Sequence, residues 1–365
     1  MEEVKVDLGV RSYQIKVGED LLKDIGTYLT ELEIGSKVLI ITNDLVDSLY
    51  GQEVKDSLKE VGFTVEVAKI GDGEKYKSLE TAQQLYDQAV VAGLDRSSSI
   101  LALGGGVVGD IAGFIAATYM RGVNFIQVPT TLLAQVDSSV GGKVAVNHAA
   151  GKNLIGDFYQ PQLVVADINV LSTLEEKELK AGLAEVIKYG VIWDEEFFTF
   201  LEDNYKEILT LEPQQVQHLI KVSCQIKAAV VAQDETERGL RAILNYGHTL
   251  GHALEAVTDY QYYRHGEGVA IGMLGAAKLA HQIGWLDKAD VIRQQRLIEN
   301  FGLPTSFSQW SVDEICQALT KDKKVEDGVI RFILAKEIGE VEIIADLEEN
   351  LIKEVTQELK VGDEK

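Results

Sequence analysis

Through the first half of this chain, short apolar runs alternate with longer stretches of helical spacing. The apolar runs have the length and composition of buried strands, and they cover residues 38–42, 65–70, 100–103, 125–128 and 163–166. Strands that alternate with helices along the sequence are typical of a parallel sheet covered by helices. We therefore predict an α/β, Rossmann-like domain over residues 1–170.

The pattern changes at about residue 171, beyond which long stretches of helical spacing dominate. Examples are residues 175–189, 213–231 and 269–283, and the next clear strand signal is at residues 330–334. The chain has 365 residues, which is more than the roughly 100 to 200 residues of a common single domain. We predict a second, mainly α-helical domain over residues 171–365.

Charge and cysteine content exclude several classes of function. The chain has 35 basic and 58 acidic residues, a formal net charge of −23, which disfavours binding to nucleic acids or anionic membranes. Its two cysteines, Cys224 and Cys316, are too few for a disulfide framework or a cysteine-rich zinc site. The N-terminus does not resemble a secretion signal, and no apolar stretch approaches the roughly 18 residues that span a bilayer. We expect a cytoplasmic protein that acts on a small-molecule substrate.

A glycine-rich segment, residues 104–110, follows the strand predicted at residues 100–103. Gly104, Gly106 and Gly109 match the G-x-G-x-x-G pattern, in which missing Cβ atoms let the backbone approach a pyrophosphate at the start of a helix. The signal is weak alone, because Asn124 stands about where the pattern has an acidic residue that binds a ribose. Both phosphate binding and a purely structural strand-to-helix turn stay open from this segment.

Two further glycine-containing segments, residues 129–143 and 151–156, are rich in polar side chains. Lys143, Lys152 and Asn153 stand beside glycines, so their side chains and the nearby backbone amides can together bind anionic oxygens. Either segment alone is equally well explained by solvent-exposed loop lysines.

A set of histidines and one glutamate has the composition of a metal site. His248 and His252 stand four residues apart and share one face of a helix, but Thr249 replaces the glutamate that zincin metalloproteases have after the first histidine. His265 follows in another glycine-rich segment, and Glu185 lies in an otherwise apolar helix. One carboxylate and two imidazoles are a ligand set of catalytic zinc. A lone histidine is more often a hydrogen-bonded core residue, and spacing does not show that these residues converge.

Taken together, these segments resemble the 3-dehydroquinate synthase family over nearly the whole chain. The matching segments are residues 104–110, 120–122, 129–143, 151–156, 182–188, 239–248, 265–273 and 322–324. The resemblance implies an N-terminal Rossmann-like domain that binds NAD, a mainly helical C-terminal domain that binds Zn²⁺ or Co²⁺, and a homodimer.

The resemblance also implies roles for individual residues. The metal ligands would be Glu185, His248 and His265. The NAD contacts would be Asn43, Glu74, Lys77, Gly105, Gly106, Asp110, Thr130, Thr131, Lys143 and Lys152, although many relatives have Asp at the position of Asn43. Catalytic residues would be Asp137, Lys143, Lys188 and His252. Substrate would be bound by Lys152, Asn153, Lys227, Arg241, Asn245, Lys323 and, across the dimer interface, Arg121. Lys321 and Lys324 flank Lys323, which leaves that assignment open by one to three positions.

The reaction that the resemblance implies converts 3-deoxy-D-arabino-heptulosonate 7-phosphate to 3-dehydroquinate and phosphate, a step of the shikimate pathway to aromatic amino acids. It proceeds by transient oxidation with NAD, elimination of phosphate, reduction, ring opening and an intramolecular aldol closure. The substrate carries a carboxylate and a phosphate, which require Lys and Arg side chains. Lys227 and Arg241 are expected to bind the carboxylate, and the remaining substrate-binding residues, with His252, are expected to surround the phosphate.

Three alternatives differ in what they require of the site. A metal-dependent polyol dehydrogenase similar to glycerol dehydrogenase would not need this many anion-binding side chains. A sister cyclase such as 2-deoxy-scyllo-inosose synthase has a substrate without a carboxylate, which Arg241 and Lys143 argue against. A non-catalytic relative would have lost metal or lysine positions, and none is visibly lost.

Overall fold

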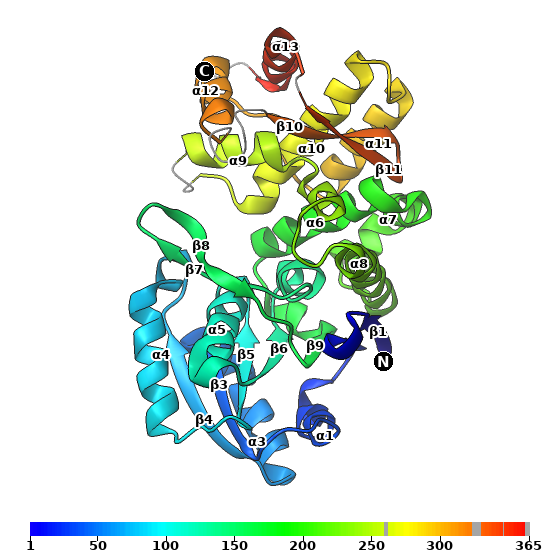
Figure 1. The fold of residues 1–365 in the computed structure, drawn as a ribbon. Helices are drawn as coiled ribbons and strands as arrows, with labels where there is room; N and C mark the ends of the chain where they lie inside the picture. The colour runs from blue at the N-terminus through cyan, green and yellow to red at the C-terminus, as the bar shows by residue number, and fades with distance from the viewer. Residues whose placement is uncertain (259–261, 323–329, 346, 362–365) are drawn as a thin grey trace. The chain divides into compact units, whose positions relative to one another are not determined.

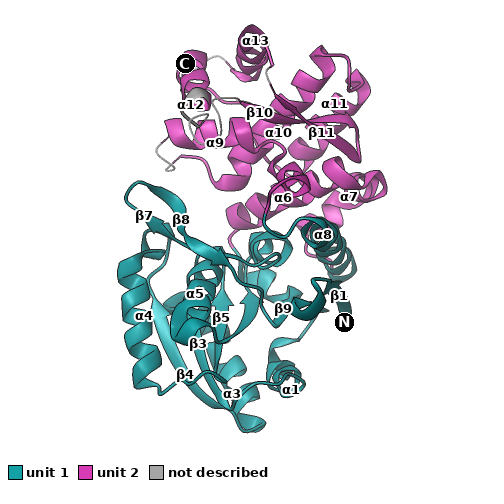
Figure 2. Ribbon diagram, in the orientation of Figure 1, with its two compact units in different colours: residues 1–174, 213–236 teal, residues 175–212, 237–365 magenta. Residues whose placement is uncertain are grey.

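The computed structural model describes residues 1–258, 262–322, 330–345 and 347–361 of the chain. It divides into two compact units (Figure 2). The first unit contains residues 1–174 and 213–236, and the second contains residues 175–212 and 237–365. The division expected from the sequence, at about residue 170, treated each domain as one continuous segment, whereas here each unit consists of two segments.

A seven-stranded sheet forms the centre of the first unit (Figure 1). Its strands, in spatial order, are β1 (Glu2–Val6), β2 (Tyr13–Gly18), β9 (Leu163–Asp167), β6 (Asn124–Pro129), β5 (Ser99–Gly104), β3 (Lys37–Asn43) and β4 (Thr64–Ile70). Only β1 pairs antiparallel, with β2, and every other pairing is parallel. The five strands predicted from apolar runs and the parallel arrangement are confirmed, while β1 and β2 were not predicted.

The first unit also contains helices, some of which pack against the sheet. They are α1 (Ile25–Thr30), α2 (Asp44–Val46), α3 (Gln52–Glu60), α4 (Leu79–Val91), α5 (Gly106–Thr118) and α8 (Pro213–Gln233). Those that pack against the sheet are α3, α4, α5 and α8. Short 3-10 or π turns occur at η1 (Gly9–Arg11), η2 (Leu22–Asp24), η3 (Asp47–Gly51), η4 (Glu74–Tyr76), η5 (Tyr119–Arg121), η6 (Ala134–Ser138) and η7 (Ile168–Thr173). The buried core joins side chains of β3, β4 and β5 to those of α4 and α5.

Helix α8 belongs to the first unit, although its sequence lies within the segment expected to form the second domain. It packs against β1, β2 and η6, and its buried residues include Val216, Leu219 and Ile220. The apolar face of α8 therefore covers the end of the sheet that carries β1 and β2. A periodic helical pattern identifies a helix but not the sheet against which it packs, which is why the sequence did not place it.

A separate antiparallel hairpin in the first unit was also not predicted. It consists of β7 (Lys143–His148) and β8 (Gly151–Phe158). Strand β7 packs against α5, where a Cβ atom on Gly113 would lie 2.2 Å from Val144 Cγ1, so the absence of a side chain at Gly113 permits the close approach. Strand β8 is largely exposed.

The second unit is mainly helical, as predicted. It contains α6 (Glu176–Trp193), α7 (Glu195–Leu209), α9 (His248–Val257), α10 (His265–Gln282), α11 (Lys288–Asn300), α12 (Val312–Asp322), α13 (Glu349–Leu359), the 3-10 turn η8 (Leu240–Asn245) and the hairpin of β10 (Arg331–Glu337) and β11 (Glu340–Ala345). Helix α10 packs against α6, α9, α11, α13 and β10, so it forms the centre of this unit. Among the described residues, no helix has both the length and the apolar character that crossing a membrane requires.

Candidate active site

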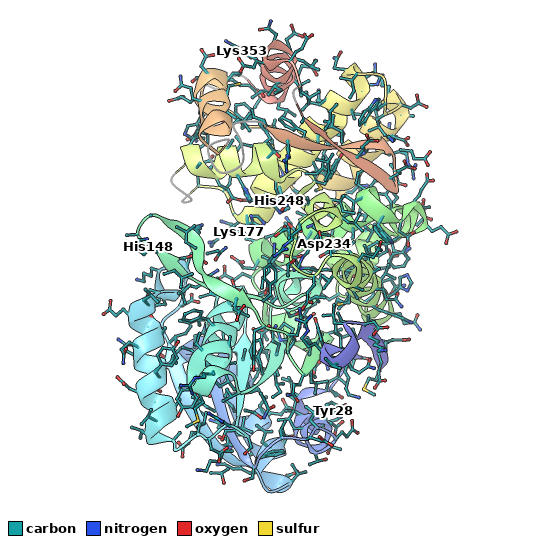
Figure 3. All side chains as sticks on the ribbon, in the orientation of Figure 1. Tyr28, His148, Lys177, Asp234, His248 and Lys353 are labelled. Carbon is teal, nitrogen blue, oxygen red and sulfur yellow. The ribbon has the colours of Figure 1, made fainter. Side chains whose placement is uncertain are left out.

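Three side chains from three helices of the second unit converge on one point. Glu185 lies in the middle of α6, while His248 and His265 are the first residues of α9 and α10. Glu185 Oε1 lies 3.5 Å from Nε2 of His248 and 3.5 Å from Nε2 of His265. One ligand atom from each residue lies within 4.8 Å of the others, so the three can bind a common metal ion. Figure 3 shows His248 at the start of α9.

Glycines allow these helices to approach closely enough for the three side chains to meet. A Cβ atom on Gly266, next to His265, would lie 2.2 Å from the carbonyl oxygen of Ala181 in α6. A Cβ atom on Gly272 of α10 would lie 1.9 Å from the carbonyl oxygen of Gly247, which precedes α9. Backbone thus packs directly on backbone at both places, and any larger residue would push the helices apart.

Burial and neighbouring charges shift the pKa values of the two histidines in opposite directions. Burial lowers the pKa of His248 to about 3, which favours the neutral, metal-binding form. Burial also opposes protonation of His265, but hydrogen bonds to Glu185 and Glu255 outweigh it and raise its pKa to about 10. The buried Lys188 donates a hydrogen bond to Glu185 Oε2 one helical turn away. Two imidazoles and one carboxylate in this arrangement suit a catalytic zinc or cobalt ion with open coordination positions.

His252 and Glu255 complete the group of titratable side chains around the three ligands. The His252 ring centroid lies 5.3 Å from that of His248 and 5.9 Å from that of His265. Glu255 Oε1 lies 2.8 Å from His265 Nδ1. Glu255 was not predicted from the sequence, although its position seven residues after His248 places it on the same helical face.

Arg241 and Asn245 lie on η8, which packs against α6. Arg241 is 1% exposed and is among the largest fully buried side chains of the described residues. Asn245 Nδ2 lies 3.4 Å from Glu237 Oε1. A guanidinium can bind a carboxylate or phosphate through two parallel hydrogen bonds, which makes the buried Arg241 a candidate for binding an anionic ligand group. Lys323 and Lys324 lie outside the described residues.

In the first unit, the glycine-rich segment forms the turn from β5 into α5. Gly105 is the N-cap of α5, and Thr130 N donates to the carbonyl of Gly104 over 3.0 Å. A Cβ atom on Gly105 would lie 3.0 Å from Thr131 Cγ2, and one on Gly106 would lie 3.1 Å from Ser138 Oγ. A side chain at either position would therefore crowd its neighbours, and the amides at the start of α5 suit a phosphate group.

Next to this turn, three of the residues expected to bind NAD, Glu74, Lys77 and Asp110, form one polar network. Lys77, which is 4% exposed, places Nζ 2.6 Å from Asp110 Oδ2 and 3.7 Å from Glu74 Oε1. Burial raises the pKa of Asp110, against the effect of Lys77. Asn147, which sequence analysis missed, donates to Glu74 Oε1 over 2.7 Å and accepts from the backbone of Asn153 over 2.9 Å.

Asn43 is the last residue of β3, and its side chain makes two hydrogen bonds. Its Oδ1 caps α2 by accepting from Val46 N over 2.8 Å, and its Nδ2 lies 3.3 Å from Asp72 Oδ1.

The remaining predicted residues of the first unit are an ion pair, formed by the buried Lys227 and the half-buried Asp137, and three exposed cations. Lys227 Nζ of α8 lies 2.5 Å from Asp137 Oδ1 and 2.6 Å from its carbonyl oxygen. Lys143 and Lys152 are exposed on the β7–β8 hairpin. Arg121 is exposed in η5, where Met120, Arg121 and Gly122 have successive positive φ angles of 50°, 68° and 119°.

Comparison with known proteins identifies the family. The family model described as 3-dehydroquinate synthase N-terminal matches residues 67–181, and the one described as 3-dehydroquinate synthase C-terminal matches residues 182–325. The 3-dehydroquinate synthase of Desulforamulus reducens is 56% identical over 350 residues, which are 96% of this chain and 98% of that protein. The chain belongs to the 3-dehydroquinate synthase family.

Solved structures of sister cyclases share the fold of this 3-dehydroquinate synthase family member. A 2-deoxy-scyllo-inosose synthase complexed with carbaglucose-6-phosphate, NAD⁺ and Co²⁺ has a TM-score of 0.89 at 29% identity and covers 98% of this chain and 100% of its own. The 2-epi-5-epi-valiolone synthase of Streptomyces hygroscopicus, with NAD⁺ and Zn²⁺ bound, has a TM-score of 0.87 at 27% identity, with 98% of each chain covered. These likenesses agree with the predicted α/β and helical fold.

Proposed function

We propose that this chain is a 3-dehydroquinate synthase, a lyase that converts 3-deoxy-D-arabino-heptulosonate 7-phosphate to 3-dehydroquinate and phosphate. The observation that carries the proposal is the 56% identity to a 3-dehydroquinate synthase over nearly the full length of both chains. The convergence of Glu185, His248 and His265 supports it, because the reaction requires the acidification of an alcohol and the polarisation of a ketone.

The two units supply binding groups for two cofactors. Glu185, His248 and His265 would hold Zn²⁺ or Co²⁺, which supplies a Lewis acid for the substrate's hydroxyl and ketone oxygens. The turn of Gly105 and Gly106 and the network of Lys77, Asp110 and Glu74 would hold NAD, which accepts a hydride from the substrate and later returns it. Solved sister cyclases with NAD⁺ and Co²⁺ or Zn²⁺ support this pair of cofactors.

Positively charged side chains would bind and orient the two anionic groups of the substrate. Arg241 and Lys227 would pair with the carboxylate, and Lys152, Asn153, Asn245, His252, Lys323 and the partner's Arg121 would surround the phosphate. Lys188, fixed by its hydrogen bond to Glu185, Lys143, and Asp137, which holds the Lys227 ammonium, would contact the hydroxyl groups and the moving protons. The main task of these residues would be to hold one conformer through several steps.

The buried Arg241 favours dehydroquinate formation over the reactions of the sister cyclases. Its guanidinium, which is 1% exposed, can pair bidentately with a carboxylate, and the substrate of 2-deoxy-scyllo-inosose synthase has no carboxylate. A polyol dehydrogenase has still less need of a buried arginine together with the exposed lysines of the β7–β8 hairpin.

Release of phosphate from the heptulosonate phosphate is the direct test of the proposed function. With NAD and Zn²⁺ or Co²⁺ present, we expect equimolar phosphate and 3-dehydroquinate and no net accumulation of NADH, because the hydride returns to the same substrate molecule. Phosphate would be measured by a coupled colorimetric assay and NADH by its absorbance. Stoichiometric NADH would instead support the polyol dehydrogenase, and absence of turnover would support a non-catalytic relative.

Replacement of Gly106 by valine is expected to weaken NAD binding. At the start of α5, the new Cβ would lie 3.1 Å from Oγ of Ser138, which belongs to η6. The two methyl groups of the valine would then enter the space beside the backbone amides of the turn. If NAD has to displace these methyl groups at a cost similar to that of overpacking, roughly 1–3 kcal/mol, its binding would weaken about five- to 150-fold. Titration calorimetry with NAD would measure the change, and Ala117→Val, near the other end of α5, is the matched control. Equal affinity in Gly106→Val and wild type would contradict the assignment of this turn.

We also propose that the enzyme is a cytoplasmic homodimer. Cys224 and Cys316 are both free thiols, which fits a reducing compartment. The expected role of the partner's Arg121 requires a dimer, whose mass light scattering would reveal.

A further inference from the structure

One face of α9 carries three side chains of the metal site. His248, His252 and Glu255 stand at positions i, i+4 and i+7, so they project from the same side of the helix. Glu255 is 6% exposed, although carboxylates are rarely buried without a partner. Its partner is the His265 ring of the neighbouring helix, and this contact has no role in the proposed ligand set.

The two nitrogens of His265 face two different carboxylates. Nδ1 lies 2.8 Å from Glu255 Oε1, and Nε2 lies 3.5 Å from Glu185 Oε1. An ionised carboxylate only accepts hydrogen bonds, so a hydrogen bond to Glu255 requires the proton on Nδ1. In the neutral ring, the lone pair is then on Nε2, on the side where Glu185 and His248 lie.

We propose that Glu255 is a positioning residue that fixes the tautomer and ring orientation of His265 and thereby strengthens metal binding at Glu185, His248 and His265. The inference deepens the proposed function and rests on it. Carboxylates that accept from the outer nitrogen of a ligating histidine raise its basicity and hold its ring, and their loss typically lowers metal affinity about 10- to 100-fold.

The other histidine ligand, His248, has a neutral carbonyl oxygen as the acceptor at its Nδ1. Nδ1 of His248 lies 3.1 Å from the carbonyl oxygen of Tyr246, a neutral group. Both rings are therefore oriented through Nδ1, but only His265 receives a full negative charge. This difference makes His265 the ligand whose binding strength depends most on its outer partner.

Close packing of α9 against α10 brings Glu255 within reach of His265. A Cβ atom on Gly251 would lie 2.9 Å from the carbonyl oxygen of Gly268, and one on Gly268 would lie 3.4 Å from Glu255 Cγ. The pair of glycines lets the helices touch through their backbones at this level, one turn from both Glu255 and His265.

The test is a measurement of Co²⁺ binding to the whole chain by competition with a chromophoric chelator, without substrate. Glu255→Ala is expected to weaken Co²⁺ binding about 10- to 100-fold. Glu255→Gln keeps an acceptor oxygen and should lose distinctly less. ¹⁵N-detected NMR of histidine in the Zn²⁺-loaded wild type should show the proton of His265 on Nδ1 and the metal on Nε2.

Glu267→Ala is the matched control for an indirect effect through the helix. Glu267 Oε2 accepts from Arg264 N over 2.8 Å at the start of α10, so its removal disturbs the same helical turn without touching the His265 ring. We expect Glu267→Ala to bind Co²⁺ within about threefold of wild type, as for most surface substitutions.

Four results would contradict the role of Glu255 while leaving the proposed function intact. Unchanged affinity in Glu255→Ala, equal losses in Glu255→Ala and Glu255→Gln, or equal losses in Glu255→Ala and Glu267→Ala would each contradict it. Two Co²⁺ ions per wild-type chain would also contradict it, because His252, Glu255 and His265 would then form a second ligand group. If the wild type binds no divalent ion, the inference and the metal-dependent function fail together.

Discussion

Replacement of Arg241 by alanine is expected to lower kcat/KM for the heptulosonate phosphate by about two to four orders of magnitude. Removal of one partner from a buried ion pair leaves the other charge unpaired at a cost of roughly 3–5 kcal/mol, which sets this range. Arg241 is 1% exposed, so solvent would screen its charge little. Steady-state kinetics would measure the loss, while bound metal and NAD affinity should stay near the wild-type values.

Two variants separate carboxylate binding from other roles of Arg241. Arg241→Lys keeps the positive charge but not the bidentate geometry, so we expect a partial loss. Arg238→Ala removes an exposed arginine three residues earlier and should change activity less than about threefold. A loss of metal or NAD together with activity in Arg241→Ala would make Arg241 a structural residue and move the carboxylate contact to Lys227 or Lys143.

Removal of the divalent metal is expected to abolish activity, and Zn²⁺ or Co²⁺ should restore it. A Lewis acid at this position contributes several kcal/mol, so we expect at least about a hundredfold loss. His265→Ala should resemble the metal-free enzyme, because it leaves Glu185 and His248 where a catalytic zinc normally has three protein ligands. Phosphate release and metal content would be measured on the same samples.

The matched control for His265→Ala is a histidine at the other end of the same helix. His281 is exposed, and its Nδ1 lies 2.9 Å from the carbonyl oxygen of Leu286. His281→Ala should keep its metal and its activity. Full turnover after exhaustive chelation would contradict metal dependence.

Strands buried on both faces were the easiest to predict from the sequence. Strand β5 is buried at every position, so its sequence is a continuous apolar run that is easily recognised. Strand β2 contains Lys16, whose ammonium lies 2.6 Å from Glu3 Oε1 of β1, and this charge interrupts the apolar run. Strand β8 is mostly exposed and has no apolar period at all. Strands that contain a charged pair or are mostly exposed, as β2 and β8 are, have no recognisable pattern of apolar residues in their sequence.

The candidate site was predictable in its residue types but not in its geometry. Histidine spacing placed His248 and His252 on one helical face, and residue type alone made Glu185 and His265 candidate co-ligands. The resemblance to a family then selected Glu185, His248 and His265 as the ligand set. Their convergence depends on glycine-mediated packing of α6 and α10, which spacing along one helix does not encode. Glu255 was missed for the same reason, since its partner His265 is on another helix.

The assignment of α8 to the first unit limits how this protein can be divided or recombined. The chain passes between the units at residues 174–175, 212–213 and 236–237. A gene fragment that ends at residue 174 would encode the seven-stranded sheet without the helix that packs on β1 and β2. Exchange of one intact unit between related genes would need crossovers at all of these places. We therefore expect the two units to be inherited as a single piece, with new specificities arising by substitution within the chain.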